Sequence, residues 1–262
     1  MEAERTYWER RLAESNTLSG VGWLGLGEPF NRWMYRVRRW VFLRRIRPLL
    51  SGSPADVLDV GTGSGFYIER WLELGAGSIT GADLTDAAVG RLRQRFPAQR
   101  FVRMDIGSDG VPLEPGSFDA ISAMDMLFHL TDDGAYERAI GNLAEMLRPG
   151  GLLVFTENFV HGPAKAGPHQ VSRSLEQIEG LVRGAGLVPL WRRPAFVLMN
   201  GPVDSDSRVL AASWAAITRA LTRWPRAGSV LGALIAPLEL LLISTRREGP
   251  STEMMACRKA DA

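Results

Sequence analysis

The chain has 262 residues, of which 45% are hydrophobic and 23% are charged, so it can bury a substantial core and does not have the composition of a disordered protein. Its formal net charge is only +2 and its mean hydropathy is close to zero, at −0.05. Cys257 is the only cysteine, which excludes an intrachain disulfide and a cysteine-based metal cluster and indicates a reducing, cytoplasmic setting.

Residues 1–54 are rich in aromatic residues and arginine, and we expect them to form a helical, substrate-capping lid. The first residues lack the basic-then-apolar pattern of a signal peptide. Residues 29–50 carry seven arginines and no acid, with apolar residues at an approximately helical spacing. We favour a lid helix that packs its aromatic side chains over a ligand. A helix that lies on an anionic membrane or holds an acidic substrate is the alternative.

From residue 55 the chain alternates between strand and helix patterns. Strands are predicted at 55–60, 78–83, 100–105, 118–124 and 152–156, with weaker signals at 187–198 and 253–258. Helices are predicted at 66–74, 85–96, 132–147 and 174–186, and Pro149-Gly150-Gly151 is expected to separate the third helix from the fifth strand. This alternation predicts an α/β fold with a doubly wound, Rossmann-like sheet covered by helices on both faces.

We therefore expect one domain over residues 55–262, with a helical insertion at about 204–246 before the last strand. Within this insertion, the apolar stretch 230–244 contains Pro237 and Glu239. It is shorter than the approximately 20 apolar residues of a membrane span. The insertion could form the wall of an apolar pocket, a dimer face or a contact with a bilayer, and the sequence does not decide among these.

A glycine-rich turn, Asp59-Val-Gly61-Thr-Gly63-Ser-Gly65, stands between the first strand and the first helix of the alternating region. Such a turn lets the backbone approach a ligand closely at a helix N-terminus. The turn lacks the Gly-Lys-Ser/Thr ending of a phosphate-binding P-loop. The remaining candidates are a dinucleotide and S-adenosylmethionine (SAM).

Three carboxylates favour SAM. Asp59 would repel a pyrophosphate but suits a sulfonium ligand that carries an ammonium group. Asp83 ends the second strand, where it can accept hydrogen bonds from ribose hydroxyls, and this position fits NAD equally well. Asp105 ends the third strand and could accept a hydrogen bond from an adenine amino group. All three are expected at the carboxyl edge of the sheet, where such folds bind ligands.

The motifs together resemble those of class I SAM-dependent methyltransferases. VLDVGTGSG is similar to the first motif of that superfamily, GADLT to the second and RMDI to the third, and FDAISAMDMLFHL and LRPGGLLVFTEN are similar to its later strands. The resemblance covers roughly residues 55–160. It implies that SAM is the cofactor and S-adenosylhomocysteine (SAH) its product, and that the sheet has seven strands with the last one antiparallel.

The same resemblance implies a set of cofactor-binding residues. They are Asp59, Gly61 and Gly63 around the methionine moiety, Thr62 and Gly65 of the same turn, Asp83 on the ribose, Leu84 against the adenine, Asp105 and Ile106 at the adenine edge, and Met124 on the methionine side.

His129, just beyond the fourth strand, is the candidate catalytic residue. Its ordinary pKa suits removal of a proton from a hydroxyl acceptor near neutral pH, and a structural role beneath the cofactor is the alternative. His161 and His169 flank a Gly/Pro-rich loop. Because these three histidines are scattered and lack carboxylates at a ligand spacing, we predict no metal site.

We therefore predict a methyltransferase that acts on a small-molecule acceptor, with O-methylation of a natural-product, glycan-type or lipid-like substrate as the leading interpretation. The alternatives are a membrane-associated lipid or quinone methyltransferase and a SAM-binding protein without transferase activity. The near-neutral chain contains no recognisable nucleic-acid module, which argues against a nucleic-acid partner. Peripheral membrane contact is left open, as is the choice between a monomer and a homodimer.

Overall fold

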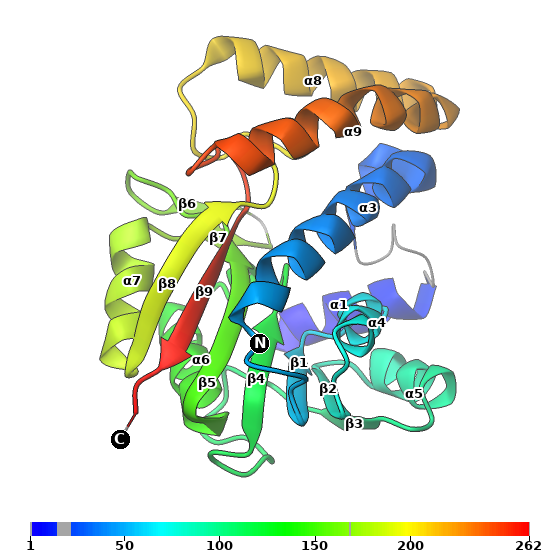
Figure 1. Cartoon of the computed structure of the whole chain (residues 1–262). Helices are drawn as coiled ribbons and strands as arrows, with labels where there is room; N and C mark the ends of the chain where they lie inside the picture. Colours follow the sequence, from blue (N-terminus) through cyan, green and yellow to red (C-terminus); the bar gives the residue numbers. More distant parts are fainter. Residues whose placement is uncertain (1, 15–21, 168, 262) are drawn as a thin grey trace.

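A seven-stranded sheet forms the centre of the computed structural model, which describes residues 2–14, 22–167 and 169–261 (Figure 1). Its strands lie in the order β3-β2-β1-β4-β5-β9-β8. The first five in this order are parallel, and β9 runs antiparallel to both of its neighbours. Their bounds are β1 (Asp56–Val60), β2 (Ser78–Asp83), β3 (Arg100–Arg103), β4 (Phe118–Ala123), β5 (Leu147–Glu157), β8 (Leu187–Pro194) and β9 (Glu253–Lys259). The predicted doubly wound sheet with an antiparallel last strand is confirmed.

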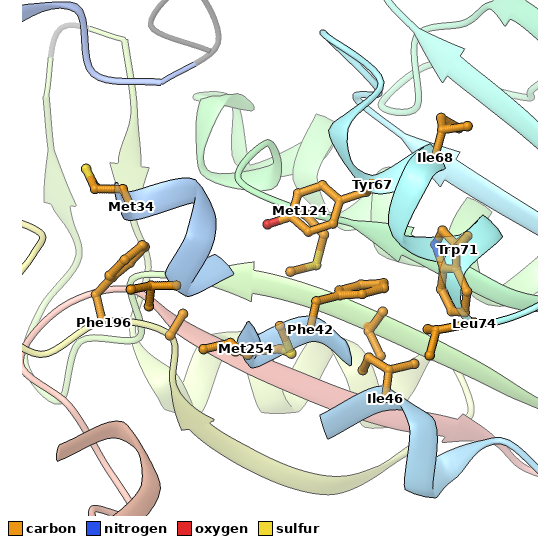
Figure 2. Close-up of a cluster of buried hydrophobic side chains, with 14 of the residues drawn as sticks. Met34, Phe42, Ile46, Tyr67, Ile68, Trp71, Leu74, Met124, Phe196 and Met254 are labelled. Atoms are coloured by element: carbon orange, nitrogen blue, oxygen red, sulfur yellow. The ribbon is translucent and has the colours of Figure 1, made fainter. Parts of the chain in front are cut away.

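Helices cover both faces of this sheet because successive strand residues point to opposite sides. On β1, Val57 joins one buried cluster and Leu58 the other. The first cluster packs against α3 (Gly27–Ile46), α4 (Phe66–Glu73) and α5 (Asp86–Arg95), and the second against α6 (Asp133–Met146) and α7 (Leu175–Gly184). Figure 2 shows the first cluster, in which Phe42 packs edge-on against Trp71 at 5.2 Å between ring centroids.

Side-chain caps start three of these helices just after the carboxyl ends of strands or in the loops that follow them. Thr85, Asp132 and Ser174 each accept a hydrogen bond from a backbone N–H three residues on, which satisfies a donor that the helix leaves free. The predicted break at Pro149-Gly150-Gly151 is wrong in detail. Helix α6 already ends at Met146, and the proline and glycines lie within β5, where Gly150 adopts a φ of +70°.

The predicted helical insertion consists of α8 (Arg208–Arg223) and α9 (Gly228–Thr245), joined by the 3-10 turn η4 (Pro225–Ala227). Both helices lie beyond α3, on the side away from the sheet (Figure 1). Helix α9 approaches α3 through glycines: a Cβ on Gly228 would lie 2.8 Å from the Phe30 backbone nitrogen, and one on Gly232 would lie 2.4 Å from the Trp33 ring. A larger residue at either position would separate the helices.

The helical stretch Pro225–Thr245 has the length and apolar composition that could cross a membrane, and 28% of an 18-residue apolar window within it is buried. Pro237 and Glu239 interrupt the apolar run of the sequence but not the helix, which continues through both residues. The carboxylate of Glu239 is fully buried and accepts hydrogen bonds from three backbone amides just after β8. These bonds anchor α9 to the rest of the molecule.

The N-terminal part contains α1 (Glu2–Glu14), the turn η1 (Leu24–Leu26), α3 and the turn η2 (Arg47–Leu49). Elsewhere, η3 (Leu127–His129) follows β4, and β6 (Lys165–Ala166) pairs with β7 (Val171–Ser172) in a separate two-stranded sheet. Residues 1 and 15–21 of the predicted lid, and residues 168 and 262, lie outside the described residues. The division into a lid at 1–54 and a domain at 55–262 stays a prediction.

Candidate functional site

A pocket lies at the carboxyl ends of β1, β2, β3 and β4 and is closed on its other sides by residues of α1, α3 and α4. Most of the residues that the sequence indicated line it: Gly61, Thr62, Gly63, Asp83, Leu84, Asp105, Ile106, Met124 and His129. Asp59 and Gly65 are not among its lining residues. The topology thus brings together side chains that come from four separate strand ends.

The glycine turn has a left-handed backbone that other residues would not tolerate. Gly61 and Gly65 have φ values of +72° and +80°. A Cβ on Gly61 would lie 2.8 Å from the Met126 side chain, and one on Gly65 would lie 2.7 Å from Leu92 and Phe96. Gly61 therefore shapes the pocket wall, whereas Gly65 turns the chain into α4 and lets α4 and α5 approach each other.

Asp83 holds the turn and the start of α5 in place. One carboxylate oxygen accepts the Gly63 backbone N–H at 2.8 Å, and the other accepts the N–H and the hydroxyl of Thr85 at 3.0 and 2.7 Å. Burial raises the pKa of Asp83, and these three hydrogen bonds oppose that rise. A carboxylate offers about four acceptor sites, so Asp83 retains limited capacity for a ligand hydroxyl.

Asp59 lies beneath the pocket rather than in it. One of its carboxylate oxygens accepts the Ser122 hydroxyl at 2.5 Å, and Ser122 accepts the Trp71 indole N–H at 2.8 Å. Among the described residues, the other oxygen, Oδ2, has no hydrogen-bond partner although it is buried. Burial raises the pKa of Asp59 to about 7. A cation bound in the pocket above would favour the ionised form of this carboxyl group.

Asp105 and Ile106 form the wall that follows β3. Asp105 accepts the backbone N–H of Gly107 at 2.9 Å, which fixes one of its oxygens. Ile106 is buried, and its carbonyl accepts a hydrogen bond from Asn142 of α6. This wall therefore combines a carboxylate with an apolar side chain, both held by neighbouring backbone and side-chain contacts.

His129 lies on η3, and its ring is held on two sides. Its Nδ1 is 2.7 Å from the backbone carbonyl oxygen of His169, and that oxygen can only accept, so Nδ1 carries the hydrogen and Nε2 is the basic nitrogen of the neutral ring. The Trp8 ring packs edge-on against the His129 ring, at 4.8 Å between ring centroids. Burial lowers the pKa of His129, which favours the neutral imidazole at neutral pH.

Asp125, which by sequence could orient the cofactor, bind substrate or face water, links α3 to the pocket. It accepts the Arg38 Nε–H at 2.7 Å, and its own backbone N–H donates to the Thr156 hydroxyl at 2.7 Å. Its φ of +55° is the only positive value of a non-glycine residue in the described chain. Such a strained backbone persists only where its surroundings over-determine it, and it is typical of functional sites.

The N-terminal helix α1 reaches the pocket because Glu9 caps α5. Its carboxylate accepts the backbone N–H groups of Asp86 and Ala87, both at 2.9 Å. A carboxylate at a helix N-terminus is stabilised by the free N–H groups there. This contact places Trp8 and Leu12 in the wall of the pocket.

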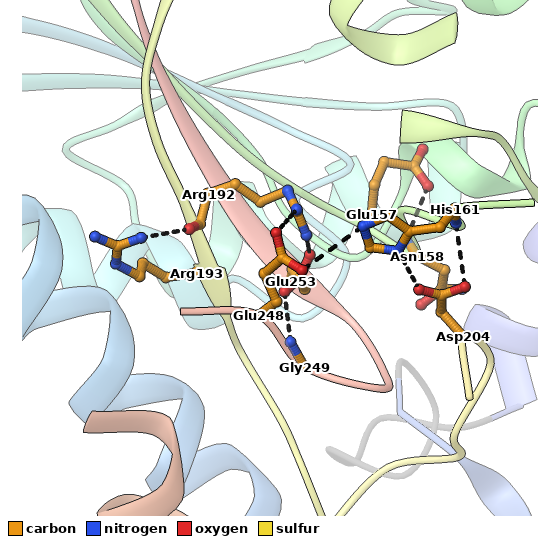
Figure 3. A network of polar contacts seen from close by, with 9 residues as sticks. All are labelled: Glu157, Asn158, His161, Arg192, Arg193, Asp204, Glu248, Gly249 and Glu253. Carbon is orange, nitrogen blue, oxygen red and sulfur yellow. Dashed lines mark hydrogen bonds and ion pairs between the residues drawn. The ribbon is translucent and has the colours of Figure 1, made fainter. Parts of the chain in front are cut away.

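His161 is not among the residues that line the pocket, and Figure 3 shows it instead in a polar network with Asp204 and Glu248. Its Nδ1 lies 2.6 Å from a carboxylate oxygen of Asp204, and its Nε2 lies 3.6 Å from one of Glu248. Arg192 pairs with both Glu248 and Glu253. This network ties the residues before α8 to those after α9. His169 contributes its carbonyl to His129, and the described residues contain no cluster of three or more potential metal ligands.

Comparison with known proteins identifies the central part of the chain. Residues 57–151 match the family described as "Methyltransferase domain". Residues 57–151 are therefore a methyltransferase domain of the class I SAM-dependent type. The match covers the glycine turn and the ends of β1 to β4, that is, the elements that form one side of the pocket.

Curated relatives of this methyltransferase domain differ in acceptor. A ubiquinone biosynthesis O-methyltransferase of Xanthomonas campestris pv. campestris is 40% identical over 102 residues, which are 38% of this chain and 41% of that protein. Another, from Ralstonia nicotianae, is 30% identical over 51% of this chain and 63% of its own length. A tRNA U34 carboxymethyltransferase of Idiomarina loihiensis is 32% identical over 45% and 38% of the two chains. The chain thus spans less than two thirds of these relatives.

Solved structures share the fold over most of the chain. The N-methyltransferase NodS from Bradyrhizobium japonicum WM9, in complex with SAH, has a TM-score of 0.57 and 18% identity and covers 98% of both chains. The [4+2]-cyclase SpnF has a TM-score of 0.54 and 22% identity and covers 87% of this chain and 81% of its own. The fold of the methyltransferase domain is therefore compatible with more than one kind of reaction.

Several residues of the pocket were missed by sequence reasoning. They are Phe66 and Tyr67 of α4 and Met126 before η3. Phe66 and Tyr67 follow the glycine turn directly, so the position of the turn could have indicated them. Tyr35 belongs to the segment that the sequence suggested would pack its aromatic side chains over a ligand, and the packing of α3 against the methyltransferase domain brings it to the pocket.

Proposed function

We propose that this chain transfers a methyl group from SAM to a hydroxyl group of a small molecule, with His129 as the general base. The observation that carries the proposal is the position of His129. It lines the same pocket as the glycine turn, and its hydrogen bond to the His169 carbonyl leaves Nε2 as the proton acceptor. Bound SAM would supply an electrophilic methyl group on a sulfonium whose leaving group is neutral.

The residues of the pocket fit such a cofactor. Asp83 would accept from the ribose, and Gly61 and Gly63 would let the methionine part approach the backbone. Leu84, Ile106 and Asp105 would surround the adenine, and Met124 would lie beside the methionine. Asp59 would act from beneath the pocket floor, where its unpartnered oxygen favours positive charge above it. These assignments fit the unpartnered Asp59 oxygen and the close approach that glycine allows.

The residues of the chain itself would perform three tasks. The Trp8, Leu12 and Tyr35 side chains would exclude water and position the acceptor, since methyl transfer depends mainly on alignment. The Nε2 atom of His129 would take the proton of the acceptor hydroxyl. The Tyr35 hydroxyl would remain a neutral hydrogen-bonding group, because burial raises its pKa to about 12.

The apolar walls favour a natural-product, glycan-type or lipid-like acceptor, and we propose a cytoplasmic location for the reaction. A membrane-associated lipid or quinone methyltransferase is the second candidate, because the Xanthomonas and Ralstonia relatives are ubiquinone biosynthesis O-methyltransferases. A SAM-binding protein without transferase activity is the third.

The test is incubation of the protein with methyl-labelled SAM and fractions of a metabolite extract, followed by mass spectrometry. We expect SAH together with a labelled product that carries an O-methyl group. A neutral His129→Gln variant should bind SAM normally and release little SAH, whereas His161→Gln, outside the pocket, should behave like the wild type. Binding of SAM without methyl release in any fraction would favour the third candidate, and a labelled N- or C-methyl product would refute O-methylation.

A further inference from the structure

The outer face of α9 carries a stripe of exposed apolar side chains. Val230, Leu234, Leu238 and Leu241 are 65%, 72%, 50% and 58% exposed. Their spacing of three or four residues places them on one face of the helix. The opposite face, with Gly228 and Gly232, packs against α3. Large side chains in such number on one exposed helix face indicate a surface that contacts another body.

Exposed arginines frame this stripe. From Arg208 to Arg247 the chain has six arginines, all exposed, and its single acid, Glu239, is fully buried. The arginines lie at the start of α8 and the end of α9, along the last turns of α8 and at the turn between the helices: Arg208, Arg219, Arg223, Arg226, Arg246 and Arg247. Trp224, 61% exposed, stands at the same turn. The surface of the hairpin is therefore apolar in its centre and positive at the turn between its helices, whereas at the other end the exposed acids Asp206 and Glu248 flank the arginines.

We propose that the α8–α9 hairpin docks flat on an anionic lipid bilayer. The leucine stripe would enter the boundary between headgroups and acyl chains, the arginines would meet lipid phosphates, and Trp224 would lie at headgroup level. An apolar helix face with flanking basic residues and a tryptophan is the composition of interfacial helices. A spanning orientation does not fit, because the glycine face of α9 is covered by α3 and Glu239 is held by backbone amides.

Charge decides between a bilayer and a second copy of the chain. A two-fold contact that brings the two turns together would place Arg219, Arg223 and Arg226 of both hairpins side by side without an acid between them, since the exposed Asp206 and Glu248 lie at the other end. Anionic phosphates supply that missing charge. This docking does not depend on the proposed methyl transfer.

The structure also moves the membrane contact away from residues 29–50, where the basic sequence first suggested it. The apolar side chains of that segment are mostly buried against the rest of the molecule, among them Phe30, Met34, Val37 and Val41. Its exposed arginines therefore lack the neighbouring apolar face that α9 provides.

Co-sedimentation of the full chain with phosphatidylcholine vesicles, with and without phosphatidylserine, tests the proposal without any measurement of turnover. We expect binding to the anionic vesicles at low salt. The double variant Leu234→Glu/Leu238→Glu should lose it, and Arg223→Gln/Arg226→Gln should weaken it about 30-fold, at about 1 kcal/mol per arginine near an anionic surface. The matched control Leu72→Glu/Val188→Glu, at exposed apolar positions elsewhere, should bind like the wild type.

Circular dichroism and thermal unfolding establish that each variant is folded, which is expected because the changed side chains are exposed. The proposal is overturned if the wild type does not sediment with anionic vesicles, or if the leucine variant binds as well as the control. A wild-type dimer in light scattering that the leucine variant dissociates would also overturn it, since a second copy would then cover the stripe.

Discussion

Replacement of Asp59 by asparagine tests the physical role of the acid at the glycine turn. The carboxyl group is buried, donates nothing when ionised, and has one unpartnered oxygen among the described residues. Asparagine keeps an oxygen for the Ser122 hydroxyl and removes the charge. The rise of the Asp59 pKa from 3.8 to about 7 corresponds to about 4 kcal/mol.

The direction in which Asp59 makes stability depend on pH follows from proton binding. Between pH 3.8 and about 7 the folded state holds the Asp59 proton more tightly than the unfolded state does, so this group stabilises the fold at low pH and the stabilisation is lost as pH rises through that window. The Asp59→Asn variant has no such dependence. As pH rises from about 4 to about 8, we therefore expect the free energy of unfolding of the wild type to fall by up to about 4 kcal/mol relative to that of the variant.

Urea denaturation of the ligand-free protein at both pH values measures this difference, with Asp86→Asn, at an exposed carboxylate, as the control. Equal differences in the free energy of unfolding at the two pH values would refute the reasoning. A second readout is ligand choice. The wild type should prefer the cationic SAM over the neutral SAH more strongly as Asp59 ionises, and Asp59→Asn should lose that pH dependence.

Three further changes probe other parts of the site. His129→Gln should lower turnover about 100-fold, and a full-rate variant in the SAH-release assay would exclude the base role. Because burial lowers the pKa of His129, the activity of the wild type should fall only when pH drops below 6.5. Asp125→Ala should lower the free energy of unfolding by about 3–5 kcal/mol because it leaves the Arg38 guanidinium buried without its carboxylate. A decrease below about 1 kcal/mol in urea denaturation would show that the ion pair is dispensable. Gly65→Ala should lower the melting temperature, since its φ is +80° and a Cβ would meet Phe96 at 2.7 Å; an unchanged melting temperature would contradict the steric argument.

Local sequence patterns predicted the sheet and most of the pocket because the relevant signals are short-range. A glycine turn after a strand places Gly61 and Gly63 at a helix N-terminus, and parallel strands bring the acids at their carboxyl ends to one edge. Asp83 and Asp105 therefore line the pocket as expected. Their roles as cofactor ligands stay predictions until a ligand is bound.

The glycine-turn motif alone does not predict on which face of the sheet the Asp59 side chain lies. Strand residues alternate between the two faces of a sheet, and Asp59 shares the face of Val57, which packs toward α4. Its carboxylate consequently meets Ser122, next to Trp71, instead of the pocket. The alternation was visible in the sequence, but the identity of the helix that covers this face was not.

Contacts between distant segments lay beyond the reach of sequence patterns. Trp8 reaches the pocket because Glu9 caps α5, and Asp125 pairs with Arg38 across 87 positions of the chain. Neither pairing leaves a periodic or spaced signal in one sequence. The exposure of the α9 stripe likewise depends on which face of the helix meets α3.

Calorimetric titration of the purified chain with SAH, for the wild type and for Asp83→Ala, tests the central claim most directly. The account predicts binding of one SAH per chain, weakened by roughly 10- to 150-fold in the variant, the scale of hydrogen bonds to a charged group. Thr85→Ala, which removes a hydroxyl that donates to Asp83 and keeps the carboxylate, controls for loss of structure and should bind with less change. A folded Asp83→Ala variant with wild-type affinity, or a wild type that does not bind SAH, would contradict the account.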